Sequence, residues 1–151
     1  MALEFYPHLT PDEMLRRGVF GGAYFRDSTE RDLDNLPPEV LHFVHVNSMP
    51  FDKNRNFYKA KAGETFAQWD ANGWIFPEDP LGWFHWYCRY HNGRRHERDE
   101  HQIRRFNNYK GRWGRFARTQ MLTKGDASAV VKQGLLQWAL DPMIILHGDP
   151  L

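Results

Sequence analysis

The chain has 151 residues, of which 26% are charged and 15% aromatic, and its formal net charge is +1. This length predicts one domain over residues 1–151, large enough to fold without a metal ion or a disulfide. A single cysteine excludes an internal disulfide, no apolar run is long enough to cross a membrane, and the N-terminus lacks the features of a signal peptide. We therefore expect a soluble, cytoplasmic protein.

The first predicted element is a short helix that begins at residue 11. Thr10 can cap the backbone N–H of Glu13, Glu13 can accept from the backbone of Thr10, and Pro11 fits the first helical position. Gly18 favours the left-handed exit from a helix. The spacing therefore predicts a helix that ends before Gly18.

The next segments carry weaker signals. Residues 40–46 are apolar and β-branched, which favours a strand or a short helix, and residues 55–61 are a second strand candidate with partial alternation. One or two helical turns are expected at residues 65–71. These signals predict an N-terminal part with short helices and little sheet.

The C-terminal half predicts three helices. Asp79 and Pro80 favour a helix from Pro80 to about His91. A longer helix should start near residues 97–100, and the third should run over residues 126–140. In the longer helix the two faces are an apolar one (Ile103, Phe106, Tyr109, Trp113, Phe116) and a polar one (His101, Arg105, Asn108, Arg112, Arg115). The fold class is mainly α, with a minor α+β element: three C-terminal helices packed on a part with short helices and a small strand.

Residues 82–95 read GWFHWYCRYHNGRR, with five aromatic rings and the only cysteine in eight residues. A helix that is apolar on every face is normally buried, so these rings favour a core helix and Cys88 an inert thiol. Arg89 cannot lose its charge, so it lies either at the mouth of a pocket or beside an acid. Arg94 and Arg95 follow the helix and are expected to be exposed.

Residues 89–118 hold ten Lys/Arg and three Asp/Glu, a local net charge of +7 against −6 for the rest of the chain. This asymmetry favours a nucleic-acid-binding protein, although a solvated helix face and a helix-turn-helix remain alternatives. Exposed rings, Tyr90 and Tyr109, would stack on bases. The predicted nucleic-acid or anion contacts are Arg89, Tyr90, Arg94, Arg95, Arg98, Arg104, Arg105, Arg112 and Arg115.

Two other functions stay open. In the first, a small enzyme uses an aromatic-walled pocket for an anionic or planar small molecule, with Tyr24, Arg26, His85 and Arg89 as its polar groups. His85 is the catalytic candidate, because histidine titrates near neutrality. In the second, the basic face of a protein-interaction module meets an acidic protein.

The pattern of histidines and acids at residues 96–101 could in principle hold a metal. Glu97 and His101 are four residues apart, but His96 and His101 diverge around a helix. This pattern is more typical of a solvated first turn, so we expect no metal and no cofactor.

Three segments together resemble a known family: Thr10–Asp27, Lys61–Arg95 and Leu135–Pro142. The GWF-x-WYCRY core at residues 82–90 is similar to that of an uncharacterised family of small aromatic-rich proteins from algae, fungi, large viruses and phages. The resemblance implies a complete small protein, a nucleic-acid role in a viral or phage-like setting, and then a location in the host cytosol or nucleus. It implies no activity and no catalytic residues.

Overall fold

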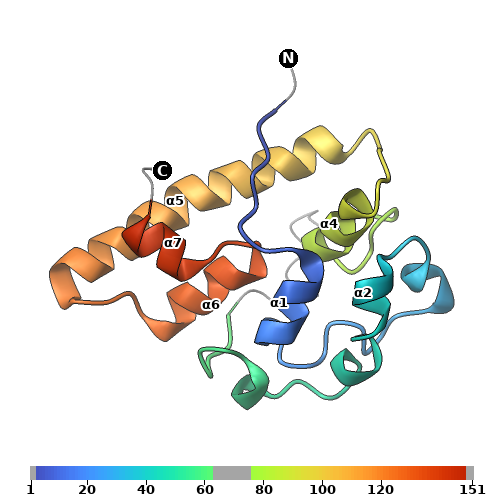
Figure 1. The fold of residues 1–151 in the computed structure, drawn as a ribbon, viewed down its shortest axis with the longest axis horizontal. Helices are drawn as coiled ribbons and strands as arrows, with labels where there is room; N and C mark the ends of the chain where they lie inside the picture. Colours follow the sequence, from blue (N-terminus) through green and yellow to red (C-terminus); the bar gives the residue numbers. More distant parts are fainter. Residues whose placement is uncertain (1–2, 63–75, 149–151) are drawn as a thin grey trace.

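The computed structural model describes residues 3–62 and 76–148 and confirms a mainly α fold (Figure 1). The α-helices are α1 (Pro11–Arg17), α2 (Pro38–Leu41), α4 (Trp83–His91), α5 (Asp99–Lys124), α6 (Ala129–Gln137) and α7 (Pro142–His147). Three 3₁₀ helices join them: η1 (Glu30–Leu33), η2 (His45–Asn47) and η3 (Lys53–Arg55). Within the described ranges the only β pairing is an isolated bridge between Phe76 and Asp79.

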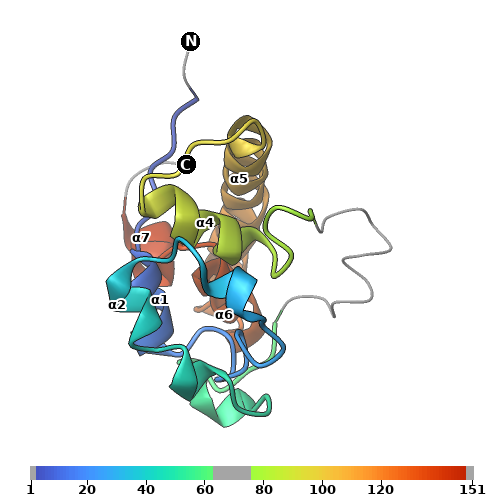
Figure 2. The same ribbon diagram turned by 90° about the vertical axis from the view of Figure 1, so that its right-hand side faces the viewer.

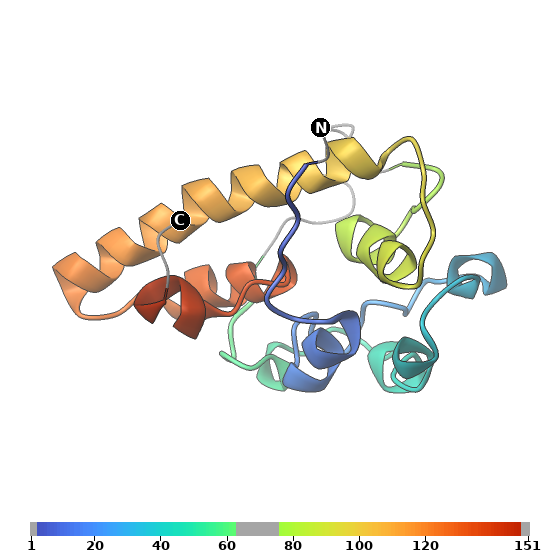
Figure 3. The same cartoon turned by 45° about the horizontal axis from the view of Figure 1, so that its top comes forward.

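The long helix α5 lies along one edge of the molecule, as Figures 1 and 3 show. It packs against α6, α7 and α4, while α1 contacts α2 and α4. Figure 2 looks nearly along α5 and places the other labelled helices on one side of it. On the opposite side of α5, Arg104, Asn108 and Arg112 are exposed, and the ring of Phe76 packs against His101 near the start of the helix. No helix in the described part of the chain is both long and apolar enough to span a membrane.

The rings of α4 build the core. Every residue from Trp83 to Arg89 is buried. The Trp83 ring stacks on Phe106 of α5 at 5.8 Å between centroids, and Phe5 from the N-terminal segment packs edge-on against Phe106 at 5.0 Å. Trp83 donates its indole N–H to the carbonyl oxygen of Gln102, and Trp86 donates to Asp99. These two bonds satisfy the polar atoms that the indoles bring into the core.

Local signals located α1 correctly. The side chain of Thr10 accepts the backbone N–H of Glu13, and Glu13 accepts the backbone N–H of Thr10. Gly18 ends the helix with φ +87°, and a β-carbon there would meet the carbonyl oxygen of Arg55. The position therefore requires glycine both for its backbone angles and for a close approach between two segments.

Other boundaries differ from the sequence-based predictions. The helix expected from Pro80 begins at Trp83, with Gly82 at its N-cap. Residues 40–46 form the end of α2 and the start of η2, and residues 55–61 form no strand. Residues 65–71, where helical turns were expected, lie outside the described residues.

The third C-terminal helix was predicted too long, and a fourth was missed. Helix α6 begins after Ser128, whose hydroxyl accepts from Val131, and it ends at Gln137. Asp141 then caps α7 by accepting from Met143, with Pro142 at the first helical position. The Asp141-Pro142 pair, directly after the predicted end of the third helix, therefore starts another helix.

Candidate nucleic-acid interface

The predicted contact residues divide into an interior group and an outward group. In the interior group, Arg89 and Arg94 both pair with Asp79. Its carboxylate accepts from Arg89 at 2.9 Å and from both terminal nitrogens of Arg94 at 2.8 and 2.6 Å. Burial by itself would raise the pKa of Asp79, but the hydrogen bonds from Arg94 and Arg89 outweigh it and hold that pKa below its usual value. Asp79 is therefore a charged, buried anchor.

Arg89 donates its other hydrogen bonds to backbone carbonyl oxygens. Its guanidinium donates to the carbonyl oxygens of Glu78, Asp34 and Arg31, at 2.6, 3.0 and 3.0 Å. The side chain is 9% exposed. Of the two arrangements left open for Arg89, pairing with an acid is the one observed, and Arg94 shares that acid. Neither guanidinium is free to contact phosphate.

His85 also lies in the interior, beside Tyr24. The Nδ1 atom of His85 accepts the backbone N–H of Leu81, so Nε2 carries the proton and donates to the carbonyl oxygen of Asp32 at 2.7 Å. Tyr24 accepts the backbone N–H of His85 at 2.9 Å and donates to Leu81. Burial, and then the charge of Arg89, lower the pKa of His85 to about 4. The imidazole is neutral and held by backbone groups on both sides.

These contacts do not form the pocket that the sequence suggested. Tyr24, His85 and Arg89 meet in a packed interior, while Arg26 is exposed and takes no part in their contacts. Cys88 is fully buried, and burial raises the pKa of its thiol well above the usual value. Its prediction as an inert thiol agrees with this environment.

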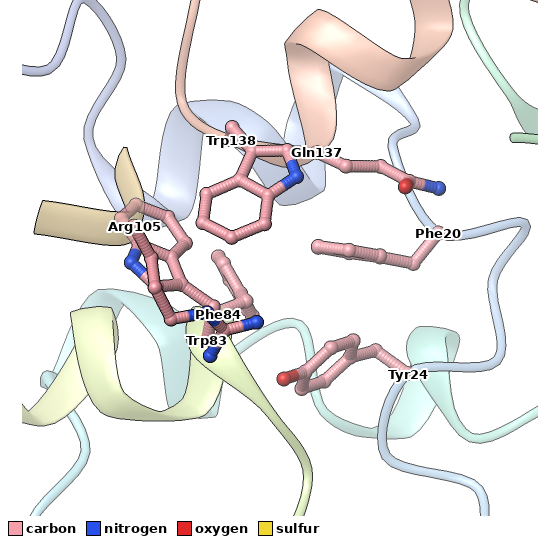
Figure 4. Close-up of a pocket in the computed structure, with 7 residues that line it drawn as sticks. All are labelled: Phe20, Tyr24, Trp83, Phe84, Arg105, Gln137 and Trp138. Atoms are coloured by element: carbon pink, nitrogen blue, oxygen red, sulfur yellow. The ribbon is translucent and has the colours of Figure 1, made fainter. Parts of the chain in front are cut away.

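A small aromatic-walled pocket does lie nearby, with different residues around it. Figure 4 shows the rings of Phe20, Tyr24 and Trp138 around a gap that Arg105 and Gln137 also line, with Trp83 and Phe84 on the α4 side. Its volume is about 20 Å³, which holds one water molecule. Arg105 lies 5.3 Å from the centroid of Trp138, and burial lowers its pKa to about 10. The gap is too small for a planar substrate.

The two rings expected to stack on bases are engaged within the protein. Arg95 lies over the ring of Tyr90, 3.8 Å from its centroid, and Phe5 and Trp86 also pack against that ring. The ring of Tyr109 stacks on Trp138 at 4.8 Å. Both tyrosines are only partly exposed, so little of either ring remains for a nucleobase.

The outward face of α5 gathers the remaining cations. We define the outward face as six exposed polar residues spaced by three or four positions: His101, Arg104, Asn108, Arg112, Arg115 and Thr119. Arg104 pairs with Glu100 at 2.8 Å. Within residues 3–62 and 76–148, no carboxylate forms an ion pair with Arg112 or Arg115. Residues 101–125 contain seven Lys/Arg and no Asp or Glu.

The structure differs from the predicted faces of α5 at two positions, Arg105 and Phe116, and Phe116 is exposed although it was placed on the apolar face. Arg105 was placed on the polar face but turns toward Trp138 and Gln102, at the margin of the apolar face. Arg104 lies on the outward face, one turn before Asn108 and two turns before Arg112. At 100° per residue, Arg105 lies closer than Arg104 to the apolar row of Tyr109 and Trp113, a signal that the sequence already carried. Asn108 and Thr119 were not among the predicted contacts.

The remaining predicted cation, Arg98, joins a cluster before α5. It lies over the ring of Phe76, 4.3 Å from the centroid, and 3.6 Å from a carboxylate oxygen of Glu78. Glu78, His96 and Glu97 bring their ligand atoms within 4.8 Å of one another. However, the Nδ1 atom of His96 accepts the backbone N–H of Arg98, so Nε2 carries the proton and neither ring nitrogen offers a free lone pair to a metal ion. Arg98 already supplies a positive charge beside Glu78. His101, the other predicted partner, is not in this group.

No family model, curated protein or solved structure matches the chain.

Proposed function

We propose that this protein binds nucleic acid through the outward face of α5. The observation that carries the proposal is that Arg104, Arg112 and Arg115 lie exposed on this face, within residues 101–125, which contain no Asp or Glu. Backbone phosphates supply most of the affinity of such a surface, because each neutralised phosphate releases counterions. Arg95, Arg98 and Arg104, whose existing contacts lie at the surface, can extend the contact toward the start of α5.

Repulsion between like charges on the outward face favours an anionic ligand. Outside α5 the described cations are mixed: Arg16 has a carboxylate partner, for example, whereas Arg26 has none among the described residues. Arg112 and Arg115 likewise have no carboxylate partner in the described part of the chain. Two neighbouring unpaired guanidinium groups on one helix face repel each other, and a polyanion would relieve that repulsion.

An acidic protein is the competing ligand for the same face. Protein interfaces usually concentrate their binding energy in a central group of buried aromatic or apolar side chains with a polar rim. The centre of the outward face is instead occupied by Asn108 and Arg112, and the exposed apolar residues Phe116 and Leu122 lie nearer its C-terminal end. A polar, cationic centre is more typical of nucleic-acid recognition.

The enzyme hypothesis has less support, because His85 is enclosed by backbone groups. His85 has both ring nitrogens bonded to backbone groups and stays neutral over the physiological range. The gap near Tyr24 holds a single water molecule. The described residues therefore offer no site in which a substrate could approach His85.

The proposal is tested by measuring binding of fluorescein-labelled DNA and RNA by anisotropy at about 50 and about 200 mM salt. Each phosphate contact should weaken affinity by roughly 3.5-fold over that range, so four contacts predict a loss of about 150-fold. Absence of binding to every nucleic acid at the lower salt concentration would contradict the proposal. A partner that is captured from cell extract and survives nuclease treatment would favour the acidic-protein alternative.

A further inference from the structure

We infer that the nucleic acid bound by the outward face of α5 is double-stranded B-form DNA, with α5 lying in the major groove. This inference rests on the proposed function and adds the class of ligand and the mode of docking. Three features of the described residues carry it: the burial of the aromatic rings of α5, the dimensions of the exposed helix, and the residues at the centre of its outward face.

The aromatic rings point away from a single-stranded ligand. Proteins that hold single strands stack successive bases on exposed rings. Here Tyr109 stacks on Trp138, and Trp113 packs against Phe116. Among the rings of α5, only Phe116 is classed as exposed, at 46%. One ring cannot form the row that a single strand needs, whereas a duplex keeps its bases stacked and requires none.

The dimensions of α5 match a major groove. With its side chains an α-helix is about 10–12 Å across, close to the roughly 12 Å width of the B-DNA major groove. From Arg104 to Arg115 the helix rises about 16 Å, the length of roughly five base pairs. Figures 1 and 3 show α5 at the outer edge of the molecule, and its packing partners α4, α6 and α7 contact it from one side. The major groove of A-form RNA is too narrow and deep for this fit.

The centre of the outward face holds side chains that can read base edges. Asn108 is exposed and makes no hydrogen bond through its side chain to another described residue, and Arg112 follows it one turn later. Asn can bond two atoms of adenine and Arg two atoms of guanine in the major groove. Arg104 and Arg115, at either end, are placed to bond phosphates or further bases. The same four residues thus combine positioning with readout.

Gly111, between Asn108 and Arg112, supports a close approach of the helix backbone. Glycine weakens a helix interior, so its presence needs a reason. Packing among the described residues does not supply one: of these, only the flexible guanidinium of Arg115 would lie near a β-carbon at Gly111, at 3.6 Å, an ordinary contact distance. Gly111 lies at the flank of the outward face, about 60° around the helix from Asn108, and a small residue there lets the helix backbone lie closer to one wall of the groove.

The test uses three labelled probes of one mixed sequence and about 20 nucleotides: duplex DNA, its single strands, and the RNA duplex. At about 150 mM salt we expect duplex DNA to bind at least about tenfold more tightly than the other two. A single strand or RNA duplex that binds as tightly as duplex DNA would overturn the inference and leave the proposed function standing. Absence of binding to all three probes at about 150 mM salt and again at about 50 mM salt would overturn both.

A second arm separates groove entry from charge. Gly111→Leu keeps every charge and adds bulk, so it should lower affinity for duplex DNA about tenfold while the salt dependence stays that of the parent protein. The matched control is Leu122→Ala, a change on the same helix two turns beyond Arg115 at a side chain that is 87% exposed. Unchanged duplex affinity in a folded Gly111→Leu protein would overturn docking in the groove. Circular dichroism establishes that each variant is folded.

Discussion

The buried network around Asp79 gives the sharpest prediction for stability. Replacing Asp79 by Asn keeps the size of the side chain but removes the charge that Arg89 and Arg94 share. Removing one partner of a buried ion pair costs about 3–5 kcal/mol, because the other charge is left buried without compensation. The side chain of Arg94 is 18% exposed and can turn partly to solvent, so we expect the lower end, about 3 kcal/mol.

The assay is urea denaturation followed by circular dichroism. At a slope of about 2 kcal/mol per molar urea, a loss of about 3 kcal/mol moves the midpoint down by about 1.5 M without changing the slope. The corresponding fall in melting temperature is about 6–12 °C. Glu100→Gln is the matched control, because it removes a carboxylate from an exposed pair with Arg104 and should cost less than about 0.5 kcal/mol. A shift for Asp79→Asn no larger than the control's would refute the reasoning.

The same network has a pH signature. Because the pKa of Asp79 is below its usual value of 3.8 in the folded protein, its contribution to stability is complete above that pH. The contribution is lost as the pH falls through the folded-state pKa, where protons enter the network. The difference in unfolding free energy between the parent protein and Asp79→Asn should therefore shrink in acid.

Three further predictions follow from buried groups. Cys88 should resist iodoacetamide in the folded protein and react fully in denaturant, as mass spectrometry would detect, and rapid labelling of the native protein would contradict its burial. The pKa of His85 is lowered from 6.5 to about 4 on folding, so the free energy of unfolding should decrease as the pH drops from 6.5 to 4. In urea titrations, His85→Gln should reduce the slope of that free energy against pH, and equal slopes in the two proteins would contradict this. Gly134→Ala should lower the free energy of unfolding by about 1–3 kcal/mol, because the added β-carbon would lie 2.6 Å from the hydroxyl of Tyr109. Adding Tyr109→Phe should restore most of that stability, and no rescue would mean that another contact is responsible.

Sequence signals were sufficient where a structure depends on neighbours along the chain. The capping box at Thr10, the end of α4 near Asn92 and the burial of Cys88 each follow from a few adjacent residues. The amphipathic course of α5 was also readable, because its apolar residues recur at helical spacing. The helix continues without interruption through Gly111.

Sequence signals failed where a partner comes from far along the chain. Asp79 followed by proline is a good helix cap, but two arginines 10 and 15 residues later hold its carboxylate instead. Leaving a buried arginine without its carboxylate would cost about 3–5 kcal/mol, more than the roughly 1 kcal/mol that a helix cap contributes. Arg105 lies at the margin of the core, not on the polar face, because its guanidinium packs on the ring of Trp138, which is also distant in sequence.

The central claim is that the outward face of α5 binds the phosphates of nucleic acid. The most direct measurement is the slope of log affinity against log salt for duplex DNA, compared between the parent protein, Arg104→Gln/Arg115→Gln and the control Arg26→Gln/Lys53→Gln. Both variants lose two exposed positive charges, but only the first loses them from α5. The account predicts that the slope falls by about 1.8 in the α5 variant and stays near the parent value in the control. Equal slopes in the two variants would contradict it.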